Sequence, residues 1–155
     1  MAQVVADSGA GVVLMHMQGV PKTMQRDPKY HDVVSEVLAF LSARIGWCES
    51  LGISRTRMAI DPGIGFGKTF AHNLQLLRNL DRFANLGCVV LIGTSRKGFL
   101  GTLTGRDVAG RMVASAVSSL AACAQGAGVV RVHDVGATVD AIKVWTALRG
   151  WGERS

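Results

Sequence analysis

The sequence has no long apolar run. Its aliphatic segments, such as CVVLIG at 88–93, are far shorter than the ~18 residues that a membrane-spanning helix needs. The N-terminus MAQVVADSGAG has no basic start, and it carries Asp7 where a signal peptide is apolar. We therefore expect neither a membrane span nor export, which places the protein in the cytoplasm.

Cysteines are few and basic runs are absent. Cys48, Cys88 and Cys123 lie in apolar contexts without C-x-x-C spacing, which favours buried reduced thiols over a disulfide or a metal site. The 17 Lys and Arg outnumber the 11 Asp and Glu, for a net charge of +6, but they are scattered along the chain. Such a diffuse positive surface suits small anionic ligands as well as nucleic acid, so charge alone leaves the ligand open.

The spacing of the apolar residues alternates between two periods. From Val34 to Cys48 they recur at helical spacing, which predicts a helix over 30–51. Short β-branched runs predict four strands, and the helical period returns between them. The predicted strands are 11–15, 57–60, 88–93 and 128–133, and the further helices are 71–86, 107–125 and 136–149.

This alternation of apolar strands and amphipathic helices indicates βαβ units and a parallel sheet, so the predicted fold class is α/β. No linker or shift in composition divides the chain, and we take 1–155 as a single domain. Residues 1–9 look like the last turns of a helix closed by Gly9, which suggests that the chain begins within a fold.

The stretch DPGIGFGKT at 61–69 resembles a phosphate-binding loop but fails its pattern. The P-loop requires a glycine where Pro62 stands, and the evenly spaced glycines also miss the dinucleotide fingerprint G-x-G-x-x-G. Asp61 follows a strand, so it either points toward a ligand over the sheet or begins an Asp-Pro turn. The glycines, Gly65 among them, let a flat ligand approach the backbone, and Phe66 is placed to pack against it.

Two other strand ends carry pairs of polar residues. Ser95 and Lys97 are two apart and share one side if the chain stays extended; the alternative is that a Thr or Ser here is the N-cap of the next helix and the charges are incidental. Arg131 and His133 are also two apart, and two cationic donors on one face suit a phosphate or pyrophosphate. The alternative for His133 is a core histidine with its hydrogen bonds satisfied.

Three residues receive structural interpretations. His16 directly follows an apolar strand, and we expect a structural hydrogen-bonding role for it. Met15 is expected in the core or in a pocket wall, because thioethers fill irregular apolar space. Lys68 is expected to be a solvated loop charge.

Four segments, VVLMHMQGVPKTMQ, IDPGIGFGKT, GTSRKGFLG and VVRVHDV, resemble the motifs of the dihydropteroate synthase family in their order and at their strand ends. The resemblance covers essentially all 155 residues. It implies a (β/α)₈ TIM barrel, which normally needs ~250 residues, and it places this chain as the C-terminal half, with strands five to eight.

The resemblance also implies a reaction. The family condenses 6-hydroxymethyl-7,8-dihydropterin pyrophosphate with p-aminobenzoate, giving 7,8-dihydropteroate and pyrophosphate in folate biosynthesis, and it is the target of sulfonamides. By motif, the catalytic residues are Asp61, Lys97, Arg131 and His133. Substrate contacts fall to Met15, Gly65, Phe66, Ser95 and Lys97.

The implied roles differ from residue to residue. Asp61 accepts hydrogen bonds from the pterin and stabilises the cation formed as pyrophosphate leaves, and Lys97 donates to the carbonyl side of the pterin. Arg131 and His133 bind the pyrophosphate, and Ser95 lies near the aminobenzoate carboxylate. Mg²⁺ enters with the pyrophosphate, and its protein ligand is expected in the N-terminal half, so we assign no metal ligand in this chain.

Two other functions remain open. One is a pterin-dependent methyltransferase of the corrinoid type, against which SRK and RVHDV argue because they suit a pyrophosphate leaving group. The other is a half barrel that is catalytically incomplete alone. We expect small-molecule substrates, no nucleic acid and no membrane, and either a homodimer or pairing with the N-terminal half.

Overall fold

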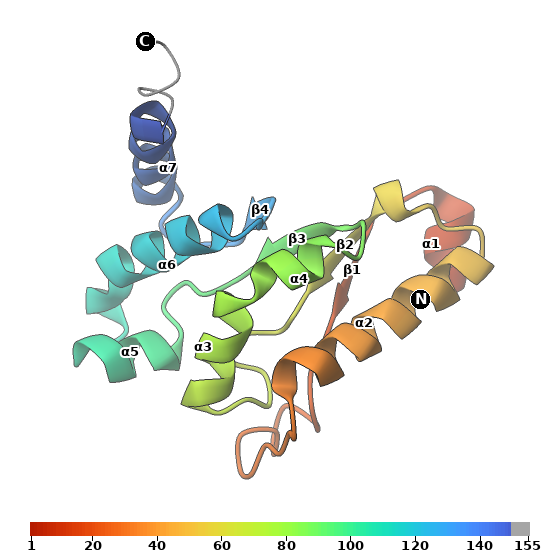
Figure 1. Ribbon diagram of the computed structural model, residues 1–155, viewed down its shortest axis with the longest axis horizontal. Coiled ribbons are helices and arrows are strands. Elements are labelled where there is room, and N and C mark those ends of the chain that lie inside the picture. Colours follow the sequence, from red (N-terminus) through yellow and green to blue (C-terminus); the bar gives the residue numbers. More distant parts are fainter. Residues whose placement is uncertain (150–155) are drawn as a thin grey trace.

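Four parallel strands form one sheet in the computed structural model, which describes residues 1–149 (Figure 1). The strands pair in the order in which they occur along the chain. Each therefore lies beside the next one in sequence, as predicted from the alternation of strands and helices. The strands are β1 (Val12–Met15), β2 (Met58–Asp61), β3 (Val89–Ile92) and β4 (Val129–Val130).

Helices connect the strands, and they follow one another along the sheet from the N-terminus to the C-terminus (Figure 1). The predicted helix over 71–86 is two helices that meet at Asn79, and the one over 107–125 begins later, after a separate short helix. The helices are α1 (Ala2–Ser8), α2 (Val33–Ser50), α3 (Phe70–Arg78), α4 (Leu80–Ala84), α5 (Gly98–Thr104), α6 (Met112–Ala124) and α7 (Val135–Arg149), with 3₁₀ turns η1 (Arg55–Arg57) and η2 (Ala109–Arg111).

The strand order shows how the sheet is wound. In a doubly wound sheet the order reverses at a switch point, and helices cover both faces. Here the order never reverses, so the helices gather on one face, as in a (β/α) barrel. The predicted α/β architecture of barrel type is confirmed for the four strands of this chain.

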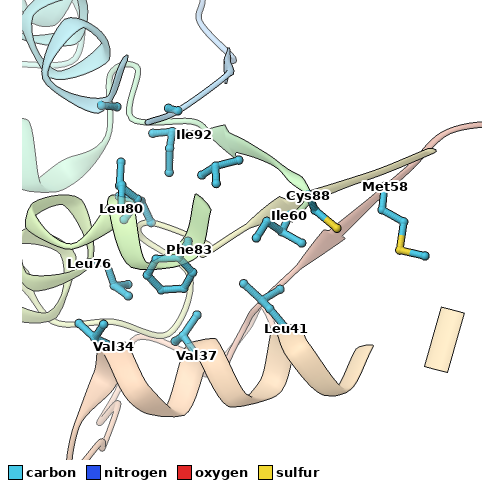
Figure 2. Close-up of a cluster of buried hydrophobic side chains, with 14 of the residues drawn as sticks. Val34, Val37, Leu41, Met58, Ile60, Leu76, Leu80, Phe83, Cys88 and Ile92 are labelled. Carbon is cyan, nitrogen blue, oxygen red and sulfur yellow. The ribbon is translucent and has the colours of Figure 1, made fainter. Parts of the chain in front are cut away.

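The helix-covered face of the sheet carries the hydrophobic core (Figure 2). Met58 and Ile60 on β2 and Ile92 on β3 are at most 2% exposed. They pack with α2 and with the α3–α4 pair, whose Phe83 is fully buried. Burying a side chain of this size stabilises the fold by roughly 1.5–3 kcal/mol, so these contacts fix the helices to the sheet.

The opposite face of the sheet is open. Register pairs Val13 with Ala59, Ala59 with Val89, and Leu91 with Val129, so these residues point to the same side. The three valines are 42–50% exposed, which is unusual for strand residues in a parallel sheet. In a closed barrel this face would line the interior.

Local signals at the helix ends agree with the sequence. Gly9 closes α1 with a φ of 73°, the left-handed conformation that favours glycine. Asp32 caps α2 by accepting hydrogen bonds from the backbone N–H groups of Val34 and Ser35. Of the three thiols, Cys48 and Cys88 are buried as predicted, while Cys123 is only partly buried. Within residues 1–149, no helix has the length and hydropathy needed to cross a bilayer.

Candidate functional site

Polar side chains gather where the strands end. The loop after β1 meets the loop after β2, because the backbone N–H of His16 donates to Asp61 O at 3.0 Å. The loops after β3 and β4 meet because the His133 backbone N–H donates to Ser95 Oγ and the Arg96 guanidinium donates to Asp134. In parallel α/β folds this edge of the sheet holds the ligand site.

The three glycines of the loop after β2 are required by backbone geometry. Gly63, Gly65 and Gly67 all have positive φ, at 73°, 81° and 63°. A Cβ at Gly63 would overlap the carbonyl oxygen of His16, and one at Gly67 would overlap that of Gln18. The even spacing therefore lets this loop pack closely against the loop after β1.

The last two residues of this stretch, Lys68 and Thr69, do not have the roles that they would have in a phosphate-binding loop. Thr69 caps α3 by accepting from the backbone N–H of His72, whose ring in turn accepts from the Thr69 N–H, so its hydroxyl is used within the fold. Lys68 is only 3% exposed. The prediction of a solvated loop charge at Lys68 was wrong, because its side chain turns inward to His16 instead of out to solvent.

Asp61 ends β2 in a buried position, with 4% of its surface exposed. Its Oδ1 accepts a hydrogen bond from the Gly63 N–H at 2.7 Å, and within the described chain Oδ2 has no such bond. The carboxylate thus makes the local turn, which confirms the turn interpretation, while contact of its other oxygen with a ligand stays a prediction.

Burial raises the pKa of the Asp61 carboxyl above its ordinary value, and the Gly63 hydrogen bond acts against that rise. Nearby positive charges also oppose it. These charges, in order of effect, belong to Lys97, Arg131 and Lys68. One carboxylate surrounded by three cations is suited to receive a ligand that carries both N–H donors and phosphate.

Lys97 crosses from the β3 loop to the glycine loop. Its Nζ donates to the carbonyl of Ile64 and lies 4.5 Å from the centroid of the Phe66 ring. Burial lowers the pKa of Lys97 to about 8, with Asp61 acting in the opposite direction. Lys97 and Phe66 together separate two adjoining cavities of about 320 Å³ each.

The first cavity lies beside the glycine loop and is lined in part by Gly65, Phe66 and Lys97. The second lies at the end of β4 and is lined by Arg131 and His133 together with Ser95. Val132, which lies between them, lines the same cavity, and β4 itself ends at Val130, short of the predicted strand end. That Arg131 and His133 share one face of a strand therefore stays a prediction.

Ser95 fixes the orientation of His133. Its Oγ accepts from the His133 backbone N–H at 3.1 Å and lies 2.9 Å from the ring Nδ1. A hydroxyl oxygen can accept two hydrogen bonds and donate one, so Ser95 can hydrogen-bond Nδ1 in either tautomer of the ring. In the tautomer that carries its proton on Nε2, this nitrogen is an N–H donor for an anion.

Arg96 holds the same two loops together from outside the site. Its guanidinium makes a two-point ion pair with Asp134, with contacts of 2.6 and 3.2 Å. The backbone of Arg96 has a φ of 58°, which is rare for a residue other than glycine. Lys97 occupies the N-cap of α5 without a side-chain cap bond, and Ser95 precedes it, so the N-cap interpretation of this pair was wrong.

Met15 and His16 flank the site on the β1 side. Met15 is the register partner of Asp61 and lies on the open face, 36% exposed. It lines neither of the two cavities. His16 is buried, as expected for a structural residue, with its ring 4.9 Å from that of Phe40.

Sequence reasoning missed three residues that hold the glycine loop. Gln25 donates to Gly65 O and lines the first cavity. Asn73 accepts from the Gly65 N–H at 2.7 Å, and Tyr30 donates to Gly67 O at 2.9 Å. No local pattern marks them, because each reaches the loop from another part of the chain.

His16 gives the site a testable pH dependence. Burial and then the charge of Lys68 lower its pKa to about 4. Because the unfolded imidazole has a pKa near 6.5, the unfolded chain binds more protons between pH 6.5 and 4, and the folded state loses stability as the pH falls through this window. We expect a loss of up to ~3 kcal/mol from this one group, at ~1.4 kcal/mol per pKa unit.

Urea unfolding of a complete barrel that contains this chain, carried out at several pH values, measures this loss of stability. His16→Gln removes the titrating ring, so its free energy of unfolding should change less between pH 6.5 and 4. Equal slopes for both proteins would exclude His16 as the cause.

A parallel sheet wound like a barrel, with a buried carboxylate and several cations at its strand ends, is typical of a ligand-binding protein of the (β/α)-barrel class. Comparison with known families is more specific. The model for pterin binding enzymes matches residues 1–133, and the chain belongs to this family.

Individual relatives have a common name. A dihydropteroate synthase from Neisseria meningitidis serogroup C is 53% identical over 140 residues, which cover 89% of this chain and 50% of that protein. The solved dihydropteroate synthase of Stenotrophomonas maltophilia, with imidazole in its active site, is 50% identical with a TM-score of 0.93, over 97% of this chain and 57% of that one.

The Xanthomonas albilineans dihydropteroate synthase, solved with 7,8-dihydropteroate, is 48% identical with a TM-score of 0.88, over 96% of this chain and 54% of that one. The chain thus spans about half the length of the relatives that it matches.

Proposed function

We propose that this chain supplies the pterin and pyrophosphate subsites of a dihydropteroate synthase. In that reaction 6-hydroxymethyl-7,8-dihydropterin pyrophosphate and p-aminobenzoate condense to 7,8-dihydropteroate and pyrophosphate. The observation that carries the proposal is the cavity lined by Arg131 and His133 together with the buried Asp61, whose carboxyl lies near Lys97 and Arg131. The bound product in the Xanthomonas relative supports it.

The residues act in sequence along the site. The free oxygen of Asp61 accepts hydrogen bonds from the pterin, and its charge stabilises the pterin cation that forms as the C–O bond to pyrophosphate breaks. The departing electron pair stays with the pyrophosphate, whose oxygens accept hydrogen bonds from Arg131 and from Nε2 of His133. The aminobenzoate amine then attacks the cationic carbon and loses a proton.

Phe66 and Lys97 stand between the two subsites. The Phe66 ring offers an apolar face to the flat substrates, and Lys97 is within reach of the carbonyl side of the pterin. Gly65 contributes close backbone surface to the first cavity, and the pterin contact of Met15 stays a prediction. Ser95 serves the pyrophosphate subsite by orienting His133, and its contact with the aminobenzoate carboxylate stays a prediction.

Mg²⁺ would accompany the pyrophosphate. Within residues 1–149 no three His, Cys, Asp or Glu side chains are arranged to hold a metal ion, and the second cavity is lined by the cations Lys97 and Arg131. These donors fit phosphate oxygens and do not fit a divalent cation, so no step here depends on a metal bound to this chain. A cytoplasmic location likewise stays a prediction.

The pyrophosphate subsite is tested with Arg131→Met. We expect the affinity of the assembled barrel for inorganic pyrophosphate to fall about 10- to 100-fold, since a hydrogen bond to a charged group contributes ~1.5–3 kcal/mol. Calorimetric titration measures it, with Arg82→Met on the exposed side of α4 as the matched control. In a crystal grown with phosphate, the ion should contact both Arg131 and His133, and an ion bound elsewhere contradicts the assignment.

A titration with three ligands separates the proposed synthase from the other functions. The synthase binds pterin pyrophosphate more tightly than the pterin alone, because Arg131 and His133 contact the phosphates. A corrinoid-type methyltransferase would prefer a methyl-folate. A catalytically incomplete half barrel would bind none of the three ligands.

A further inference from the structure

Lys68 is the most deeply buried charged side chain near the site that the proposed reaction leaves unused. Only 3% of its surface is exposed, which is rare for lysine. Its Nζ lies 3.0 Å from His16 Nδ1 and 3.0 Å from the carbonyl oxygen of Phe66. One ammonium group therefore joins the loop after β1 to the loop after β2.

The position of Nζ inside the glycine loop is equally specific. A Cβ built on Gly63 would lie 3.4 Å from Nζ, so the ammonium lies against the turn that Asp61 makes with the Gly63 N–H. Nζ also donates to the carbonyl oxygen of Phe66, which lies three residues after Gly63 in the same loop. Lys68 thus spans the segment 61–66 from within.

The surrounding charges explain how such a group is tolerated. Burial lowers the pKa of Lys68 to about 7, the negative charge of Asp61 raises it, and Lys97 lowers it. His72 and Glu36 also face this cluster, since Lys68 acts on the His72 ring and Glu36 on His16. His16 is neutral at pH 7, so its Nδ1 accepts a hydrogen bond and Lys68 is the donor.

We propose that Lys68 is a positioning residue of the pterin subsite: it lines the cavity beside the glycine loop, but its Nζ is engaged by His16 and the Phe66 carbonyl, and it holds both so that Asp61 and the Phe66 ring stay in place. This inference rests on the proposed function. It also gives the lysine of the GKT sequence a role within the fold in place of a phosphate contact.

The alternative is a purely structural role, and the two differ in what they predict. Replacing a buried charge by an apolar side chain of similar length removes its desolvation cost, so Lys68→Met need not destabilise the protein. If Lys68 positions the loop, this variant loses affinity for the pterin ring only. The Arg131–His133 subsite has its own support from Ser95 and Arg96 and should be unaffected.

The experiment uses a complete barrel that carries this chain, for example joined to the part of the Neisseria relative that it does not cover. We expect Lys68→Met to weaken 6-hydroxymethylpterin binding about tenfold and to leave the affinity for inorganic pyrophosphate unchanged. Lys29→Met, at an exposed lysine of the neighbouring loop, should change neither affinity. The pKa of His16, followed by NMR, should rise in Lys68→Met because a neighbouring positive charge is removed.

Unchanged pterin affinity overturns the proposal, and so does a parallel loss of pterin and pyrophosphate affinity. If Lys68→Met does not fold, Lys68→Leu, which likewise lacks an N–H donor, takes its place with the same criteria. Failure of both variants to fold makes Lys68 a structural residue and overturns the proposal as well. A wild-type barrel that binds no pterin contradicts the proposed function itself, which is a different result.

Discussion

Asp61→Asn should weaken pterin binding by about 10- to 100-fold while the fold stays intact. The free carboxylate oxygen is lost as a charged acceptor, and a hydrogen bond to a charged group contributes ~1.5–3 kcal/mol. The asparagine can still accept from the Gly63 N–H, and it no longer buries a charge, so the free energy of unfolding should not fall.

Calorimetric titration of the assembled barrel with 6-hydroxymethylpterin measures this change. Asp107→Asn is a suitable control, because Asp107 also accepts from a glycine N–H, that of Gly110 at 2.9 Å, in an exposed turn. We expect wild-type affinity for the control. Unchanged affinity in Asp61→Asn would remove Asp61 from the site.

The second large effect concerns the isolated chain, which should not persist as a folded monomer. Its sheet ends at β1 and β4 with unpaired backbone groups along each edge, and the open face exposes Val13, Val89 and Val129. Bare edges and an apolar face together favour association, with a second copy or with the other half of a barrel.

Sedimentation of the purified chain measures its association state. We expect dimers or larger assemblies that resolve into a single complex when the complementary half is added. A monodisperse, folded monomer would show that the open face tolerates water and would refute this prediction.

The strands and the site could largely be predicted from sequence, because both depend on short local patterns. β-branched runs gave four strand positions within a few residues, and the polar residues at their ends proved to be neighbours in the structure. The helix boundaries were harder. Asn79 interrupts a continuous helical pattern, and the glycine-rich segment over 98–104 forms a helix that packs Phe99 and Leu100 into the core.

Lys68 shows why the rest could not be predicted. A lysine in a glycine-rich loop is normally solvated, and nothing within a few residues of it indicates burial. Its partner His16 is 52 positions away in the sequence, and they meet only because β1 pairs with β2. The same holds for Gln25, which reaches Gly65 from 40 positions away.

A pyrophosphate-release assay, run on the chain alone and after mixing with the complementary half of a barrel, tests most directly whether this chain supplies the pterin and pyrophosphate subsites. Both substrates, pterin pyrophosphate and p-aminobenzoate, are supplied with Mg²⁺ in each case. We predict no release above background from the chain alone, and release from the mixture that Asp61→Asn or Arg131→Met in this chain reduces at least tenfold. Turnover by the chain alone would contradict this proposal, and so would a mixture whose activity is the same with and without the two substitutions.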